Sequence, residues 1–104
     1  MTAIEELRLL TASAIEPALA DDELAAILAY AARPDPGGFA PQDEQWTPTY
    51  DINAAAARGW LIKAGRAAAI IESGEGGEAT SKVFDNCRSM ARVYAAKANS
   101  TVRI

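Results

Sequence analysis

Residues 50–71 form a stretch rich in alanine and glycine around a single tryptophan, Trp60. Alanine has the highest helix propensity of any residue and Asp51 supplies an N-cap, so the stretch predicts one long helix. At about 100° per residue, one broad arc of this helix is apolar and includes Trp60, while the opposite arc carries Arg58, Lys63 and Arg66. Small side chains let neighbouring helices approach closely, so this helix is expected at the centre of a helical domain, with Trp60 in the core.

Two shorter helices are expected before it. Thr2 and Glu5 fit a capping box, in which each side chain accepts a hydrogen bond from a backbone N–H at the start of a helix over residues 2–14. The acidic residues 21–23 suit the positive end of a second helix, and Pro34 is expected to end it.

A fourth helix is expected over residues 81–98. Its apolar positions recur with helical period and include Phe84, Cys87 and Tyr94. Phe84 and Tyr94 are therefore expected to share the core with Trp60. Cys87 is expected to pack there rather than to react.

The segment between the second and third helices, residues 33–49, holds four prolines and a Gly-Gly pair, so no helix or strand is expected in it. Phe39 and Trp46 are its apolar anchors: they either pin the loop to the core or meet a partner.

The sequence thus predicts an all-α fold, a bundle of about four helices with one long loop. The helical domain spans residues 1–98 and is followed by an extended tail over residues 99–104.

The composition argues against catalysis. The chain has no histidine, which removes the commonest general base and metal ligand, and its one cysteine cannot form an internal disulfide. We expect no enzymatic activity, no cofactor and no metal. No secretory signal or apolar run of membrane-spanning length is visible, so a soluble protein made in the cytoplasm is expected.

Charge divides the chain into two halves. Residues 1–52 contain ten acidic and two basic side chains, whereas residues 53–104 contain four acidic and eight basic ones. The halves either neutralise each other within one fold or let one copy attract another.

Basic side chains of the third and fourth helices could also form a nucleic-acid surface: Arg58, Lys63, Arg66, Lys82, Arg88, Arg92 and Lys97. Solvated faces or ion pairs with protein are the alternative that the acidic net charge of −4 favours.

Four segments resemble the head–tail connector, or neck adaptor, proteins of tailed bacteriophages. They are residues 48–60, 63–68, 81–87 and 90–94, within a similarity that covers roughly residues 21–95. The chain departs from the family pattern in its turn, where residues 75–78 are acidic and include no aromatic side chain.

The resemblance implies a structural protein of the virion neck. Such adaptors form a homo-oligomeric ring, usually of twelve copies, beneath the portal protein. The ring extends the DNA channel and docks the stopper or tail-completion protein, and the C-terminal tail inserts into the portal. On this basis Val102, Arg103 and Ile104 are expected to bind the portal. A second set is expected to contact neighbouring subunits or neck proteins: Phe39, Trp46, Arg58, Lys63 and Arg66.

Two other functions compete with this interpretation. A small helical DNA-binding regulator would bind duplex DNA as a monomer, with an affinity that falls steeply with salt. A small enzyme or enzyme accessory is the weaker alternative because no histidine is present to activate a hydroxyl.

Overall fold

The computed structural model describes residues 1–98 and contains four α-helices. They are α1 (Ala3–Thr11), α2 (Asp21–Tyr30), α3 (Ile52–Glu72) and α4 (Glu78–Lys97). The prediction of a small all-α bundle is confirmed for the described part of the chain, which contains no strand. The tail residues Val102, Arg103 and Ile104 lie outside the described residues.

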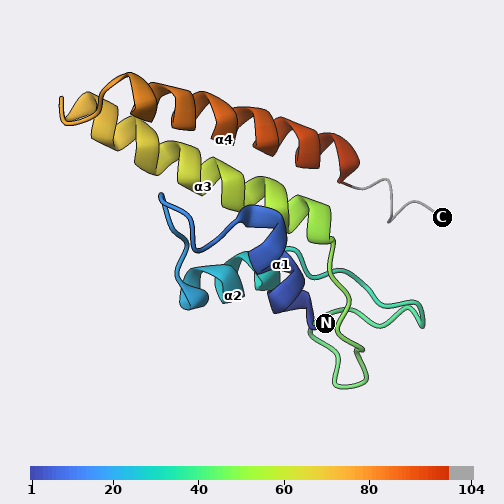
Figure 1. Cartoon of the computed structure of the whole chain (residues 1–104). Coiled ribbons are helices and arrows are strands. Elements are labelled where there is room, and N and C mark those ends of the chain that lie inside the picture. Colours follow the sequence, from blue (N-terminus) through green and yellow to red (C-terminus); the bar gives the residue numbers. More distant parts are fainter. Residues whose placement is uncertain (99–104) are drawn as a thin grey trace.

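Figure 1 shows α3 at the centre of the molecule, with α4 alongside it as the second arm of a helical hairpin. The shorter α1 and α2 lie on the other side of α3. The helix contacts agree with this view, because α4 packs against α3 but against neither α1 nor α2. The α3–α4 hairpin therefore has one arm covered by the N-terminal helices and one arm that only α3 covers.

Local sequence sets the helix starts. Thr2 Oγ1 accepts a hydrogen bond from the Glu5 amide at 3.2 Å, and Glu5 Oε1 accepts one from the Thr2 amide at 3.3 Å, as the capping box predicts. Asp51 Oδ1 accepts from the Ala54 amide at 3.0 Å and caps α3. At α2 the cap is different, because Glu23 Oε1 accepts from the Ala20 amide at 2.9 Å.

Two helix boundaries differ from the prediction. α1 ends at Thr11 rather than at residue 14, because Ala12 adopts a left-handed conformation with φ of 47°. The Ser13 amide then donates back to the Arg8 carbonyl at 3.1 Å, which closes the helix end. α4 begins at Glu78 rather than at residue 81, because the Gly77 carbonyl already accepts from the amides of residues 80 and 81.

The buried apolar side chains form two clusters. The first joins α1, α2 and the start of α3, and its members are Leu7, Leu19, Leu24, Ile27, Leu28, Ala31, Ala55 and Ala56. The second joins α3 to α4 through Trp60, Ala64, Cys87 and Ala91. Trp60 and Cys87 are buried as predicted, whereas Phe84 and Tyr94 are only half-buried at the edge of the second cluster.

Gly59 lets the end of α1 approach α3 closely. A Cβ atom at this position would lie 2.7 Å from Thr11 Cγ2 and 3.3 Å from Leu19 Cδ1, so no larger residue fits without movement. The end of α1 consequently rests directly on the α3 backbone, one residue before Trp60. This contact places the last carbonyl groups of α1 beside the polar side chains of α3.

Candidate interaction surfaces

The end of α1 is held by two side chains of α3. The Lys63 ammonium donates to the Thr11 carbonyl at 2.9 Å and to the Ala12 carbonyl at 2.7 Å, and the Trp60 indole N–H donates to the Leu10 carbonyl at 3.0 Å. The last carbonyls of a helix have no partner within the helix and carry partial negative charge, so a cation there is favourable. Lys63 Nζ also lies 4.6 Å from the centre of the Trp60 ring.

The prediction that Lys63 lies on the arc opposite Trp60 is wrong, and the residue is only 1% exposed. Three positions along a helix turn by about 300°, so Lys63 lies only about 60° from Trp60 and points toward the polar end of α1. Burial lowers the pKa of Lys63 and raises the pKa of the nearby Cys87 thiol. A buried thiol with a raised pKa is a poor nucleophile, so Cys87 is a packing residue.

Arg66 and Arg58 differ in how far they are committed within the chain. The Arg66 guanidinium forms an ion pair with Glu23 and donates to the Ala18 carbonyl at 2.6 Å, which ties α3 to the start of α2. The hydrogen bond from Arg66 is the main reason that the pKa of Glu23 is lowered. Arg58 is exposed and stacks on Tyr30, with its guanidinium carbon 4.1 Å from the ring centre. Arg58 is therefore available to a partner, whereas Arg66 is engaged.

Residues 33–49 form an ordered loop around the buried carboxylate of Asp35. Its Oδ1 accepts from the Phe39 amide at 2.9 Å and its Oδ2 from the Thr47 amide at 2.7 Å. The hydrogen bond from Thr47 contributes most to the lowered pKa of Asp35. Trp46 donates from its indole nitrogen to the Arg33 carbonyl at 2.8 Å and packs edge-on against Tyr50. Phe39 and Trp46 are expected either to pin the loop or to meet a partner. These contacts show that Trp46 pins the loop.

The tip of this loop, residues 39–44, presents a different chemistry. Phe39 is 40% exposed, and Asp43 and Glu44, a few residues further along the chain, are exposed as well. Asp43 Oδ2 accepts from the Ala40 amide at 2.9 Å, which shapes the turn. We call this apolar and acidic surface the acidic loop tip.

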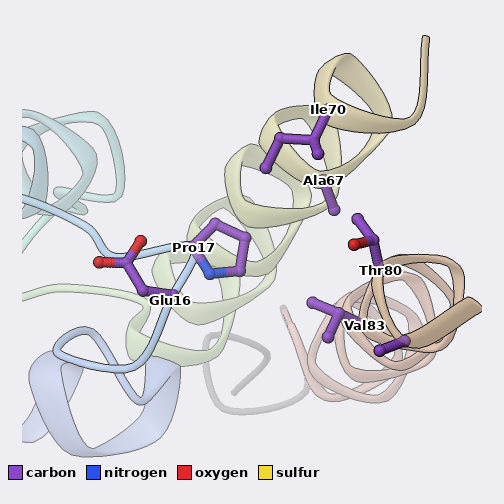
Figure 2. Close-up of a pocket in the computed structure, with 7 residues that line it drawn as sticks. Glu16, Pro17, Ala67, Ile70, Thr80 and Val83 are labelled. Carbon is purple, nitrogen blue, oxygen red and sulfur yellow. The ribbon is translucent and has the colours of Figure 1, made fainter. Parts of the chain in front are cut away.

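An apolar groove lies where the hairpin meets the connection between α1 and α2. Figure 2 shows Thr80 and Val83 projecting from α4 toward Ala67 and Pro17, while the Glu16 carboxylate extends away from the enclosed space. The groove measures about 210 Å³, below the roughly 300–1,000 Å³ of ordinary ligand pockets. It lacks converging polar groups and therefore offers no machinery for catalysis.

A second groove lies on the outer surface of the hairpin. It is lined by one residue of α3 and four of α4: Leu61, Arg88, Ala91, Arg92 and Ala95. Leu61 is 58% exposed, and neither arginine has an ion-pair partner among residues 1–98. Arg88 lies over the Phe84 ring at 5.5 Å. We call this surface the basic groove.

The described residues contain no cluster of three or more histidine, cysteine, aspartate or glutamate side chains that could hold a metal ion. Over the same part of the chain, no helix is both long and apolar enough to cross a membrane.

Comparisons with models of protein families, with curated proteins and with solved structures give no match in any of the three.

The predicted interface residues lie in different environments. Phe39 and Arg58 are exposed, Trp46 is half-buried within the loop, and Lys63 and Arg66 serve contacts inside the chain. Sequence reasoning missed Asp35, although its position in a Pro-Asp-Pro-Gly-Gly segment is typical of a turn residue that hydrogen-bonds nearby amides. It also missed the pairing of Arg58 with Tyr30, for which the sequence carries no local signal.

Proposed function

We propose that this protein is a structural head–tail connector of a tailed bacteriophage. It forms a ring beneath the portal protein, extends the DNA channel and docks the stopper or tail-completion protein. The proposal rests on the resemblance of residues 48–60, 63–68, 81–87 and 90–94 to neck adaptors. One structural observation supports it most: the chain carries two unlike exposed surfaces, the acidic loop tip and the basic groove, on different elements.

Unlike surfaces are what a ring of identical copies requires. A contact between two different patches repeats from copy to copy and closes into a ring when the rotation between copies allows it. The ordered loop around Asp35 and the α3–α4 hairpin hold these patches in fixed positions. Within the described part of the chain, the grooves lack a catalytic arrangement, which favours binding over chemistry.

The proposed contacts rest on the resemblance for the tail and on exposure for the residues of the loop and α3. Val102, Arg103 and Ile104 bind the portal, in keeping with the apolar and basic alternation of their sequence. Phe39 and Arg58 contact a neighbouring subunit or neck protein, because both side chains are exposed. Trp46, Lys63 and Arg66 act indirectly by shaping the loop and the α1–α3 junction.

Deletion of residues 99–104 tests this function. We expect the truncated protein to keep the helical circular dichroism and melting temperature of the full chain, because the two core clusters lie within residues 3–94. It should fail to co-sediment with portal rings. A matched control replaces residues 99–104 by a Gly-Ser segment of equal length. Portal binding by the truncated protein, or normal assembly of infectious particles with it, would refute the proposal.

DNA-binding regulation is the second candidate, and it is favoured by the two arginines of the basic groove, for which residues 1–98 supply no ion-pair partner. It predicts that the isolated protein binds duplex DNA with an affinity that falls steeply as salt rises. A connector in which DNA only passes through the channel predicts no such monomer affinity.

A further inference from the structure

We propose that the acidic loop tip of one copy docks into the basic groove of a second copy. The acidic loop tip comprises residues 39–44, and the basic groove is lined by Leu61, Arg88, Ala91, Arg92 and Ala95. This inference rests on the proposed repeating assembly and names the two surfaces that would join its subunits.

The chemistry of the two surfaces is complementary. The loop tip offers one exposed aromatic ring, Phe39, and two exposed carboxylates, Asp43 and Glu44. The groove offers one exposed leucine, Leu61, and two guanidinium groups without ion-pair partners in the described part of the chain. Arginine and aromatic side chains dominate the binding energy of protein interfaces, and opposite charges steer their encounter. The groove therefore fits an acidic and apolar protein segment of the kind that every copy carries.

The loop tip is organised before it binds. Asp35 holds the amides of Phe39 and Thr47, and Trp46 holds the carbonyl of Arg33. An ordered segment loses less conformational entropy on binding than a disordered one, which makes a small contact surface effective.

Residues 1–98 of a copy leave its own groove open. Among these residues the groove is lined only by α3 and α4, and no residue of the loop lines it. Figure 1 shows the loop extending from the N-terminal end of α3 toward the side of α1 and α2, whereas α4 lies along the other side. The two surfaces of one copy are thus free to meet two different neighbours, as a head-to-tail contact requires.

Charge reversal on each side tests the contact. One variant carries Arg88→Glu and Arg92→Glu, and the other carries Asp43→Lys and Glu44→Lys. Each variant alone places like charges at the contact, so we expect its self-association in sedimentation velocity to weaken by more than about tenfold relative to the natural protein. An equimolar mixture restores opposite charges and should associate again. A structural defect in either variant would not be rescued by mixing.

Lys82→Glu is the matched control, because Lys82 lies on α4 outside the groove and is exposed. It should associate as the natural protein does. In ¹⁵N-labelled natural protein, dilution should shift the amide signals of residues 39–44 and of the groove more than those of α2. Raising salt should weaken the association, since the Debye length falls to about 3 Å at 1 M.

Several results would overturn the inference. They are an absence of self-association of the natural protein up to about 1 mM, undiminished association of the reversed variants, and failure of the mixture to associate. Duplex DNA that shifts the groove signals while the mixture stays monomeric would also overturn it, in favour of nucleic-acid binding. Portal co-sedimentation distinguishes the two proposals. If the protein binds the portal but the mixed variants do not associate, the connector function stands and the proposed contact is wrong. If the mixed variants associate but the protein does not bind the portal, the contact stands and the connector function is wrong.

Discussion

Lys63 is the residue whose role differs most from its sequence pattern. Its ammonium is buried and bonded to two carbonyl groups at the end of α1, so a charge that looks like a surface feature acts as a helix cap. Two opposing effects meet at this site. Burial disfavours the charged form and lowers the pKa of Lys63, while the carbonyl oxygens and the Trp60 ring favour the ammonium. Lys63 stabilises the fold only if these favourable contacts outweigh the cost of burying the charge.

Lys63→Met distinguishes these effects. Methionine keeps an unbranched side chain but leaves the Thr11 carbonyl without its donor, whereas the Ala12 carbonyl keeps the hydrogen bond from the Ile15 amide at 3.0 Å. An unsatisfied buried group costs about 1–3 kcal/mol. We therefore expect the free energy of unfolding, measured by urea titration, to fall by about that amount. Lys82→Met on the exposed face of α4 should change it by less than about 0.5 kcal/mol. Unchanged or higher stability of Lys63→Met would mean that the cost of burying the charge exceeds the value of its hydrogen bonds.

Among the elements, the loop of residues 33–49 depends most on a single side chain. Asp35 accepts one hydrogen bond from the amide of Phe39, four residues further along the chain, and another from the amide of Thr47, twelve residues further along. The Asp35 pKa is lowered in the folded state, mainly by the hydrogen bond from Thr47. Its contribution to stability is therefore complete above the ordinary aspartate pKa of about 3.9 and is lost as pH falls through the lower folded-state pKa.

Asp35→Asn should expose this dependence. The variant should be less stable than the natural protein at pH 7, because an amide nitrogen replaces one accepting oxygen. The difference in free energy of unfolding should shrink as pH falls below the ordinary aspartate pKa of about 3.9 and through the lower folded-state pKa, where the natural carboxylate also becomes protonated. Amide chemical shifts should change within residues 35–47 and stay constant in α1. Glu44→Gln, at an exposed position in the same loop, is the matched control and should show neither effect. A difference that stays constant with pH would contradict the assigned role of Asp35.

For the molecule as a whole, local signals were readable from the sequence and long-range ones were not. The capping box of Thr2 and Glu5 and the N-cap of Asp51 involve neighbours in the chain, so their residue types suffice to predict them. The environment of Lys63 depends on carbonyls about fifty residues away, which no local periodicity encodes.

The same distinction applies to Phe84 and Tyr94. Their spacing predicts a shared face, and they lie beside Trp60 as expected. Tyr94 also packs against the first cluster. Both residues stay half-buried because, within residues 1–98, α3 is the one helix that lies along α4. The candidate contact surfaces were predicted only as residue types, because their accessibility depends on which side of α3 each element occupies.

The distribution of burial predicts uneven stability along the hairpin. The last buried residue of α3 is Ala67 and the first of α4 is Cys87, whereas Ile70 and Val83 near the turn are exposed by 41% and 36%. Regions with few buried apolar contacts open locally without global unfolding. Amides near the hairpin turn, in residues 70–83, should therefore exchange with deuterium much faster than those of residues 55–64.

Two substitutions separate local from global opening in this experiment. Leu24→Ala removes a fully buried side chain of the first cluster and should lower global stability by about 2–5 kcal/mol. It should accelerate exchange in residues 55–64 and leave the already fast amides near the turn little changed. Val83→Ala should accelerate only the turn region. Uniform protection along α3, or equal effects of both substitutions on all amides, would show that the hairpin opens as one unit with the N-terminal helices. The predicted pattern instead gives the molecule a stable base around α1–α3 and a compliant end, so a partner that binds near the turn would meet a surface able to adjust to it.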